Sequence, residues 1–407
     1  MNTEERKAVF AHEIGHIVHR DFIIMSFAAS IISLLYHISQ LLLRTRRYRI
    51  ERSEGGGYEI NKRNKGRGYE ILIGVLAYIF YLIGTYILLF LSRIREYYAD
   101  EFSAKETNNT DALASALIKI SYGIIAKPEE KRQLELMQGT RMLGIVDFKA
   151  AKGIGLAYIT GIKLKSWKPI EKALLFDLKN PWAFLYELGS SHPLTAKRIK
   201  RLEKIKNVTM FDFEKIEEKY HIDDKKLYAN FFKDVLFESL PLILFAIFSA
   251  LAISIYLGFV ILPLNLTQLI GLCLICLGFS IIAKTFYKYS SLPPEKASVL
   301  ELMEDVYASP IRGKPVELEG EIVGRGVPGL ILSEDMMLQD NTGLIYLNYE
   351  GIIPFFSNLV FALFKLEKFV GKKVKSYGWF VRGLSPRIEL RKIIVDEKEI
   401  KSWVRAW

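Results

Sequence analysis

Four stretches of the chain are apolar and free of charged residues. They cover Phe22–Leu43, Ile71–Leu91, Pro241–Leu262 and Leu264–Ala283. A helix of about twenty apolar residues is long enough to cross a hydrocarbon layer of roughly 30 Å. Uncharged runs of this length are rare in soluble cores. The pattern therefore predicts four transmembrane helices, arranged as two hairpins.

The polar parts of the chain follow two different patterns. Residues 92–240 are mostly helical in pattern, whereas the C-terminal part alternates apolar and polar positions, which is typical of strands. After a predicted helix around Glu295–Val306 we expect five or so short strands, with a D-N-T-G turn at residues 340–343. The strand segments are V-E-L-E-G-E-I-V-G, G-L-I-L-S, G-L-I-Y-L-N-Y, K-K-V-K-S-Y-G-W-F-V and R-I-E-L-R-K-I-I-V. Together they predict a small, OB-like β-barrel.

These patterns divide the chain into five parts. A short polar helix occupies residues 1–21, a first transmembrane hairpin 22–91 and a helical polar region 92–240. A second hairpin covers residues 241–286, and the β-rich part covers 287–407. The predicted fold class is a mainly α integral membrane protein with four transmembrane helices and a small C-terminal β-barrel.

Charge and cysteine content change this picture little. The chain has 407 residues and a formal net charge of +11. Nine Lys or Arg lie in the loop 44–70, where they suit a solvated loop beside acidic lipid headgroups. A nucleic-acid partner would need a concentrated basic face with stacking aromatics, which this loop does not offer. Cys273 and Cys276 both lie in the fourth apolar run, where packing explains them better than redox chemistry or metal binding.

Candidate chemistry lies directly ahead of the first apolar run, in A-H-E-I-G-H-I-V-H-R-D. His12 and His16 are four residues apart and share one face of a helix, so both imidazoles can bind one metal ion. Glu13 lies beside that ion and can take a proton from the attacking water, as in H-E-x-x-H metalloproteases. The longer motif with a third histidine is excluded, because Phe22 stands where it requires histidine. A surface helix that happens to hold histidines is the alternative.

The hairpin topology supplies a third ligand. Both ends of a hairpin emerge on one membrane face, so the residues after the second apolar run return to the histidine helix. There, S-R-I-R-E-Y-Y-A-D offers Glu96, and a His, His, Glu site with an open fourth position has the composition of a catalytic zinc site. Asp100 lies four residues further on and can accept an N–H from a ligating imidazole. The alternative is an ordinary juxtamembrane helix with exposed acids.

The order of these motifs resembles the membrane zinc endopeptidases of the HtpX kind, whose relatives include the CaaX prenyl proteases and the Oma-type mitochondrial proteases. The resemblance covers about residues 3–204 and includes S-S-H-P-L-T-A-K-R-I-K-R-L near its end. It implies a gluzincin-type helical domain with one Zn²⁺ ion per subunit, bound by His12, His16 and Glu96. Glu13 would then act as general base and acid.

The resemblance also gives His192 a role near the metal, where it could stabilise the oxyanion formed when water attacks a peptide carbonyl. From the residues alone, His192 is a polar residue before a proline, and a structural role is equally compatible with its position. His19 and His37 have no partner in this scheme. His19 is interpreted as a flanking surface residue, and His37 as a polar residue of the first span, either buried between helices or near its end.

The function implied by the resemblance is membrane-protein quality control, with protein or peptide substrates cleaved close to the bilayer. The rival hypothesis is a catalytically silent membrane scaffold that keeps the metal site and binds partners through its barrel. A prenyl-protein processing protease would need more spans, enclosing a chamber. The resemblance places the site on the cytoplasmic face of the cell membrane, whereas the basic loop 44–70 argues for the opposite orientation.

Two further expectations concern the ends of the chain. In the resembled family, membrane spans and a soluble stretch precede the zinc helix, whereas here Met1 almost adjoins it. Zincin proteases hold the substrate along a sheet edge ahead of that helix. The sequence therefore predicts a start placed too late or a shortened form without this edge. In the C-terminal part, Tyr377, Trp379 and Phe380 are expected to pack inside strands rather than to stack on nucleic acid.

Overall fold

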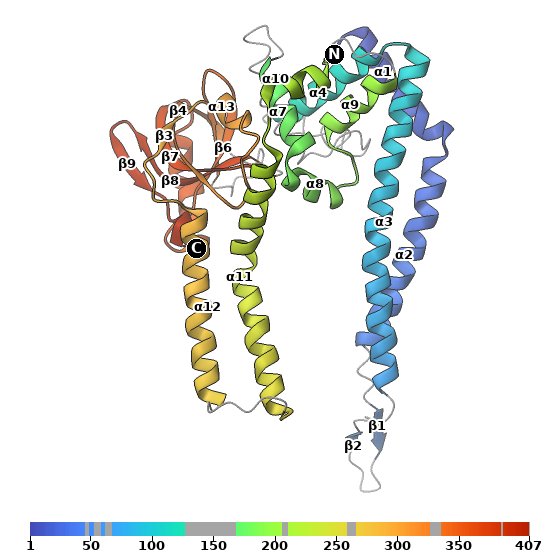
Figure 1. Ribbon diagram of the computed structural model, residues 1–407, viewed down its shortest axis with the longest axis vertical. Helices are drawn as coiled ribbons and strands as arrows, with labels where there is room; N and C mark the ends of the chain where they lie inside the picture. Colours follow the sequence, from blue (N-terminus) through green and yellow to red (C-terminus); the bar gives the residue numbers. More distant parts are fainter. Residues whose placement is uncertain are drawn as a thin grey trace.

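The computed structural model consists of two long helical hairpins and a head built from helices and a β-barrel. Helices α2 (Asp21–Arg44) and α3 (Arg67–Thr107) form one hairpin, and α11 (Asp224–Tyr256) and α12 (Leu266–Lys288) form the other. All four are long and apolar enough to cross a membrane, and both pairs extend from the head in one direction (Figure 1). The structure describes residues 1–44, 49–52, 58–61, 67–126, 168–205, 211–258, 266–325, 335–383 and 386–406.

The first two predicted spans fall within α2 and α3, and the other two coincide with α11 and α12 over most of their length. Leu264, the predicted start of the fourth span, lies outside the described residues. The third predicted run extended to Leu262, but α11 ends at Tyr256. Gly258 then has a φ of 76°, a left-handed conformation that ends helices and suits glycine. Pro241, taken as the start of that run, lies inside the helix, which already begins at Asp224 under an Asp223 cap. The far end of the first hairpin carries two short paired strands, β1 (Arg49–Arg52) and β2 (Tyr58–Asn61).

The helical part of the head packs around one apolar cluster. Leu113 and Leu117 of one helix meet Leu174 and Ile199 of two others, and all four side chains are fully buried. The short helices of this part turn apolar side chains into this cluster, except α8, whose Ala183 packs in a smaller cluster with Phe176 and Leu194. These helices are α1 (Thr3–Val18), α4 (Thr110–Ala126), α7 (Lys168–Lys179), α8 (Pro181–Leu188), α9 (Thr195–Ile205) and α10 (Phe213–Tyr220).

The C-terminal part of the head is a closed barrel. Its strands follow the order β4-β5-β6-β8-β7, and β7 pairs back with β4, which closes the sheet. Only β6 and β8 run parallel within this ring. Short β3 and β9 add to β4 and β8. The elements are β3 (Glu295–Lys296), α13 (Val299–Met303), β4 (Lys314–Arg325), β5 (Met336–Gln339), β6 (Leu344–Asn348), α14 (Pro354–Val360), β7 (Lys373–Val381), β8 (Arg387–Val395) and β9 (Lys398–Lys401).

Four of the five predicted strand segments are confirmed as β4, β6, β7 and β8, and G-L-I-L-S lies outside the described residues. The helix predicted around Glu295–Val306 is too long, because Glu295 pairs with Val316 in a parallel strand and α13 covers five residues only. Trp379 and Phe380 are buried, as expected for strand packing, whereas Tyr377 is only half-buried. Strand β5, which the sequence analysis missed, has buried side chains at three successive positions and so lacks a clear alternation.

Buried polar contacts hold the barrel and the second hairpin against the helical part. Asp234 of α11 accepts hydrogen bonds from Trp182 Nε1 of α8 (3.1 Å) and from the Tyr287 hydroxyl of α12 (2.6 Å). Arg382, which follows β7, donates to the carbonyl oxygen of Ala173 in α7 (3.2 Å), and its guanidinium lies 3.8 Å from the ring centre of Phe176. The head is therefore one connected body on two hairpins.

Candidate metal centre

Helix α1 carries the histidine motif and has a well-formed start. Asn2 accepts a hydrogen bond from the backbone N–H of Glu5, and the Glu5 side chain accepts one from the backbone of Asn2 (2.8 Å each). This reciprocal cap satisfies two of the N–H groups that a helix start leaves free. Glu5 also accepts hydrogen bonds from Ser115 (2.7 Å) and Lys119 of α4. The cap thereby ties α1 to the helical core.

A glycine lets α1 approach α3 closely. A Cβ atom at Gly15 would lie 3.1 Å from Ala99 Cα and 3.2 Å from Phe102 Cβ. Next to this contact, the Ser103 hydroxyl donates to the Ala8 carbonyl oxygen at 2.6 Å. The crossing places the face of α1 that carries the histidines against the part of α3 just beyond its apolar run.

The structure brings His12, His16 and Glu96 together, and one ligand atom from each lies within 4.8 Å of the other two. The Nε2 atoms of the two histidines are 3.2 Å apart, and each lies 3.6 Å from a carboxylate oxygen of Glu96. Two ligands about 2.0–2.1 Å from a tetrahedral zinc ion are separated by roughly 3.3 Å. These three side chains therefore have the spacing of a metal-binding set.

Unpartnered polar atoms support the same conclusion. Glu96 Oε2, Glu13 Oε1 and His192 Nδ1 are shut off from solvent and have no hydrogen-bond partner in the described part of the structure. Buried polar groups are nearly always paired, and several unpaired ones at one place indicate an absent ligand or ion. The donor set of two imidazoles and a carboxylate is one that binds divalent transition metals.

Asp100 lies behind His12. Its Oδ1 atom is 3.0 Å from His12 Nδ1, although the ring N–H is not in hydrogen-bond geometry here. Arg198 of α9 holds the carboxylate from the other side, with Nε 2.8 Å from Oδ2 and Nη2 2.6 Å from Oδ1. Its Nη1 atom also lies 3.5 Å from Glu96. Arg198 is fully buried and orients both carboxylates, a contact that the sequence analysis did not anticipate.

Asp21, at the first turn of α2, is a second carboxylate that the sequence analysis missed. Its Oδ2 atom lies 2.5 Å from His16 Nδ1 and accepts the imidazole N–H. The same oxygen is 3.0 Å from Nε of Arg95. A carboxylate behind a ligating imidazole sets the tautomer and orientation of the ring. The sequence did carry a sign of this role. Asp21 is an isolated acid at the start of an uncharged span, and a buried charge requires a partner.

Burial and the carboxylates around α1 shift the pKa values of side chains on this helix. Burial by itself lowers the pKa of His12, but the adjacent Asp100 and Glu96 carboxylates outweigh it and raise that pKa to about 9. Burial raises the pKa of Glu13, and the neighbouring His12 and His16 partly offset this rise. A carboxyl group whose pKa is raised toward neutrality is better suited to accept and return a proton.

His192 reaches the site from the loop between α8 and α9. Its Nδ1 atom lies 3.3 Å from Glu96 Oε1, and its side chain is 14% exposed. Arg93 of α3 donates to the backbone carbonyls of Glu187 (2.6 Å) and Ser190 (2.8 Å), which holds the end of α8 in place. Ser190 also exchanges hydrogen bonds with the backbone of His192. The loop is therefore positioned by the same helix that carries Glu96.

The other two histidines considered lie outside this group. His19 is exposed and its ring lies 6.0 Å from those of Tyr98 and Phe102. His37 is exposed on α2, with its ring 5.7 Å from that of Tyr36. Neither approaches the ligand set. The exposure of His19 agrees with its interpretation as a surface residue, whereas the exposure of His37 argues against burial between helices.

Comparison with known proteins identifies the class. Residues 1–206, half of the chain, match Peptidase family M48, and the chain belongs to this family. The resemblance to HtpX-type proteins is thereby confirmed. A protease HtpX homolog of Aquifex aeolicus is 31% identical over 50% of this chain and 53% of its own length. Protease HtpX homolog 2 of Sulfurisphaera tokodaii is 32% identical over 50% of this chain and 58% of its own length.

A shorter match, 36% identical over 30% of this chain, is to a protease HtpX homolog of Methanothermobacter thermautotrophicus, of which it covers 39%. The chain thus spans about half the length of the curated relatives it matches. No solved structure matches it. The family match covers the first hairpin and the helical part of the head as far as α9, whereas α10, the second hairpin and the barrel lie beyond it.

Proposed function

We propose that the protein is a zinc-dependent membrane endopeptidase. The observation that carries this proposal is the convergence of His12, His16 and Glu96, with Glu13 beside them, at the head end of a membrane hairpin. Family membership and the protease names of the relatives agree with it. His12, His16 and Glu96 would hold one zinc ion per subunit, as in a gluzincin-type site. Such an ion supplies a Lewis acid that polarises a carbonyl group and makes water nucleophilic at neutral pH.

The side chains around the ligands then have distinct tasks. Glu13 takes a proton from the attacking water and delivers it to the amine that leaves, so no net proton is retained. His192 donates an N–H to the oxyanion that develops on the peptide carbonyl. Asp100 and Asp21 keep the two ligating imidazoles in one orientation, and Arg198 fixes Asp100 in turn.

Glu13→Gln tests this function most directly. Glutamine keeps the size and polarity of the side chain but cannot accept the proton, so we expect peptide cleavage to fall by a factor of at least about 100. Metal content should be unchanged, because Glu13 is not a ligand. The assay uses zinc-loaded, full-length protein with casein and with a model membrane substrate. Equal cleavage by the variant and the parent protein would exclude the proposal.

The wider setting of the reaction is also proposed. The site lies five residues, roughly 8 Å along α3, beyond the end of the apolar run, so it operates close to the bilayer surface. This supports membrane proteins as substrates and a role in their quality control. We follow the family resemblance in placing the site on the cytoplasmic side of the cell membrane.

The barrel is proposed to be OB-like and to dock substrates or partners. Its support is a closed ring of five strands in the order β4-β5-β6-β8-β7, with α14 between β6 and β7. We further propose the division into a zinc-binding helix (1–21), a first hairpin (22–91), the rest of the peptidase domain (92–240), a second hairpin (241–286) and a β-rich domain (287–407).

A further inference from the structure

A pocket of about 520 Å³ lies where the second hairpin enters the head. Its walls come from the start of α11, the end of α12, the loop after α13 and the start of β4. A volume of this size is typical of sites for small ligands. It lies outside the metal centre described above, and neither the family match nor the proposed function assigns it a role.

Three cations line this pocket. Lys226, on α11, has its Nζ atom 4.8 Å from the ring centre of Tyr307, and no carboxylate within ion-pair distance among the described residues. Arg312 donates to the Tyr307 carbonyl oxygen at 3.1 Å, and its Nη1 atom lies 3.7 Å from Asp234 Oδ1. Lys314 is half-exposed and lies 3.3 Å from the exposed Glu295.

Neutral donors add to the cations. Asn230 contributes an amide for which the described residues offer no hydrogen-bond partner. The Tyr307 hydroxyl accepts the backbone N–H of Asp223 at 2.9 Å, which leaves its own proton free to donate. One carboxylate, that of Asp305, also lines the pocket. Positive charge and donors therefore outnumber acceptors, which favours an anion with several oxygens.

The position of the pocket relative to the membrane indicates which ligands can reach it. Glu238 of α11 pairs with Lys284 of α12 at 2.7 Å, and beyond this pair both helices are apolar. Tyr287 lies three residues, roughly 5 Å, on the head side of the pair, and Asn230 eight residues, roughly 12 Å. The headgroup layer is roughly 5–8 Å thick. The lower end of the pocket, lined by Phe286 and Tyr287, therefore lies at headgroup level. Asn230 and Lys226, the latter twelve residues and roughly 18 Å from the pair, lie on the solution side of that layer.

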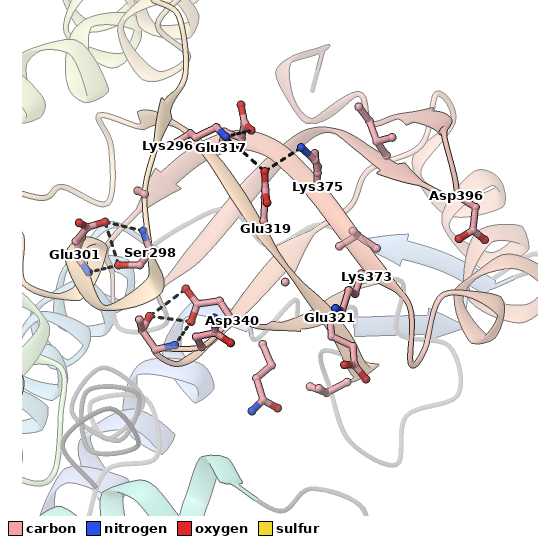
Figure 2. Close-up of a pocket in the computed structure, with 18 of the residues that line it drawn as sticks. Lys296, Ser298, Glu301, Glu317, Glu319, Glu321, Asp340, Lys373, Lys375 and Asp396 are labelled. Atoms are coloured by element: carbon pink, nitrogen blue, oxygen red, sulfur yellow. Dashed lines mark hydrogen bonds and ion pairs between the residues drawn. The ribbon is translucent and has the colours of Figure 1, made fainter. Parts of the chain in front are cut away.

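A second pocket, of about 1040 Å³, has the opposite character. It lies on the outside of the barrel, and Figure 2 shows Glu317, Glu319 and Glu321 along one face of β4. Glu319 pairs with Lys375 at 3.0 Å and lies 3.6 Å from Lys296, so these carboxylates belong to a cross-strand ladder of ion pairs. Nothing there indicates a ligand beyond the ladder.

We propose that the pocket between the second hairpin and the barrel binds a phosphate group, taken from an anionic lipid headgroup or from solution. Lys226, Lys314 and Arg312 bind the phosphate oxygens, and Asn230 and Tyr307 donate hydrogen bonds to them. The anion binds where the second hairpin, the barrel and the peptidase part meet. The position of the barrel therefore depends on the lipid composition of the surrounding membrane.

The test compares two double variants of the full-length protein. Lys226→Gln/Lys314→Gln removes two charges from the pocket, and both side chains are exposed enough to be replaced without disturbing the fold. The matched control, Lys225→Gln/Lys233→Gln, removes two exposed charges from the same helix, α11, outside the pocket. Native mass spectrometry in detergent measures binding of phosphatidylglycerol and phosphatidylcholine, and titration calorimetry measures binding of inorganic phosphate.

We expect phosphatidylglycerol to bind the pocket variant about tenfold more weakly than the parent protein and the control, as loss of charge-assisted hydrogen bonds predicts. Phosphatidylcholine should show little difference. If the tenfold loss appears with inorganic phosphate and not with the lipid, the site takes its phosphate from solution. If the pocket variant matches the control with both anionic probes, the proposal is wrong. These are binding measurements, so they stand independently of peptidase activity.

Discussion

The two membrane hairpins are alike in length and hydropathy but differ in what they bring to the head. The first carries chemistry, because α3 continues from its apolar run to Glu96 and Asp100, and α2 begins with Asp21 behind His16. The second places Asp234 at the same membrane face, where it accepts hydrogen bonds from Trp182 and Tyr287. One hairpin thus forms part of the candidate metal centre, and the other anchors the barrel to the peptidase part.

This difference has a mechanical consequence. A ligand on a continuous 41-residue helix moves with the span that carries it, so tilting of α3 in the bilayer would act directly on the spacing of Glu96 from the imidazoles. Asp234 also lies on a continuous span, α11, but its partners Trp182 and Tyr287 join that hairpin to the head and belong to no metal-binding set. Changes in the first hairpin should therefore alter metal binding, and changes in the second should alter stability.

The largest effect is expected for Glu96→Ala. It removes a ligand, so both zinc affinity and cleavage should fall further than the roughly 10- to 100-fold that loss of an outer partner causes. Metal content after dialysis and the rate of casein cleavage measure it. The matched control is Glu101→Ala on the same helix, whose carboxylate pairs with Lys105 instead. A Glu96→Ala protein that retains one tightly bound zinc would contradict the ligand assignment.

A comparison of the two hairpin carboxylates should separate their roles. Asp21→Asn removes the negative charge behind His16, and we expect zinc affinity to fall roughly 10- to 100-fold. Asp234→Asn should leave zinc affinity unchanged and lower the free energy of unfolding by about 1–3 kcal/mol, because buried donors lose their partner. Competition with a zinc-chelating dye and thermal unfolding measure the two quantities. Equal losses of zinc affinity in both variants would refute the division between the hairpins.

Two glycine substitutions test the same difference between the two hairpins, and their expected effect is smaller. At Gly15, a new Cβ atom meets backbone of α3 at 3.1 Å, so Gly15→Ala should push α1 outward, weaken zinc binding a few-fold and destabilise the fold by about 1–3 kcal/mol. At Gly278 of α12, a Cβ atom meets nothing within 4 Å, and Gly278→Ala should be neutral. Thermal unfolding measures the change in stability, and competition with a zinc-chelating dye measures the change in zinc affinity. A neutral Gly15→Ala would show that the crossing of α1 and α3 is not tight.

Local rules explain what the sequence predicted well. The length of uncharged runs identified the spans, and four-residue spacing placed His12 with His16 and Glu96 with Asp100 on shared helix faces. Hairpin topology then joined the two helices. Of the residues that were missed, Arg198 contacts Asp100, which lies far away in the chain. Asp21 contacts His16 only five residues away, but across the junction of two helices, where helical periodicity gives no guide. A buried arginine with no acid nearby in sequence gives no local sign of its partner.

The barrel shows the same limit. Strands with clear alternation were found, whereas β5 was missed because buried side chains occupy three successive positions and its neighbours in the sheet decide which faces are covered. The helix predicted around Glu295–Val306 was too long for a related reason. Its first residues pair with β4, and this tertiary pairing overrides a helical propensity that is weak over so short a segment.

The smallest effect concerns the contact between the barrel and α7. Asp177 is partly exposed, but its Oδ2 atom is shut off from solvent and unpaired among the described residues, and burial raises its pKa to about 7 despite the opposing charge of Arg382. The folded protein therefore favours protonated Asp177. Its contribution to stability is complete below pH 3.8, the ordinary pKa, and is lost as the pH rises through 7.

Asp177→Asn mimics the protonated form at every pH. The difference in free energy of unfolding between the variant and the parent protein should therefore grow by about 2 kcal/mol as the pH rises from 5 to 8. Thermal unfolding across this range measures the gain. A constant difference between the two proteins would mean that the carboxyl group is hydrated or paired, and that the contact of the barrel with α7 does not depend on pH. Zinc affinity should not change, because Asp177 belongs to the anchoring side of the molecule and not to the first hairpin.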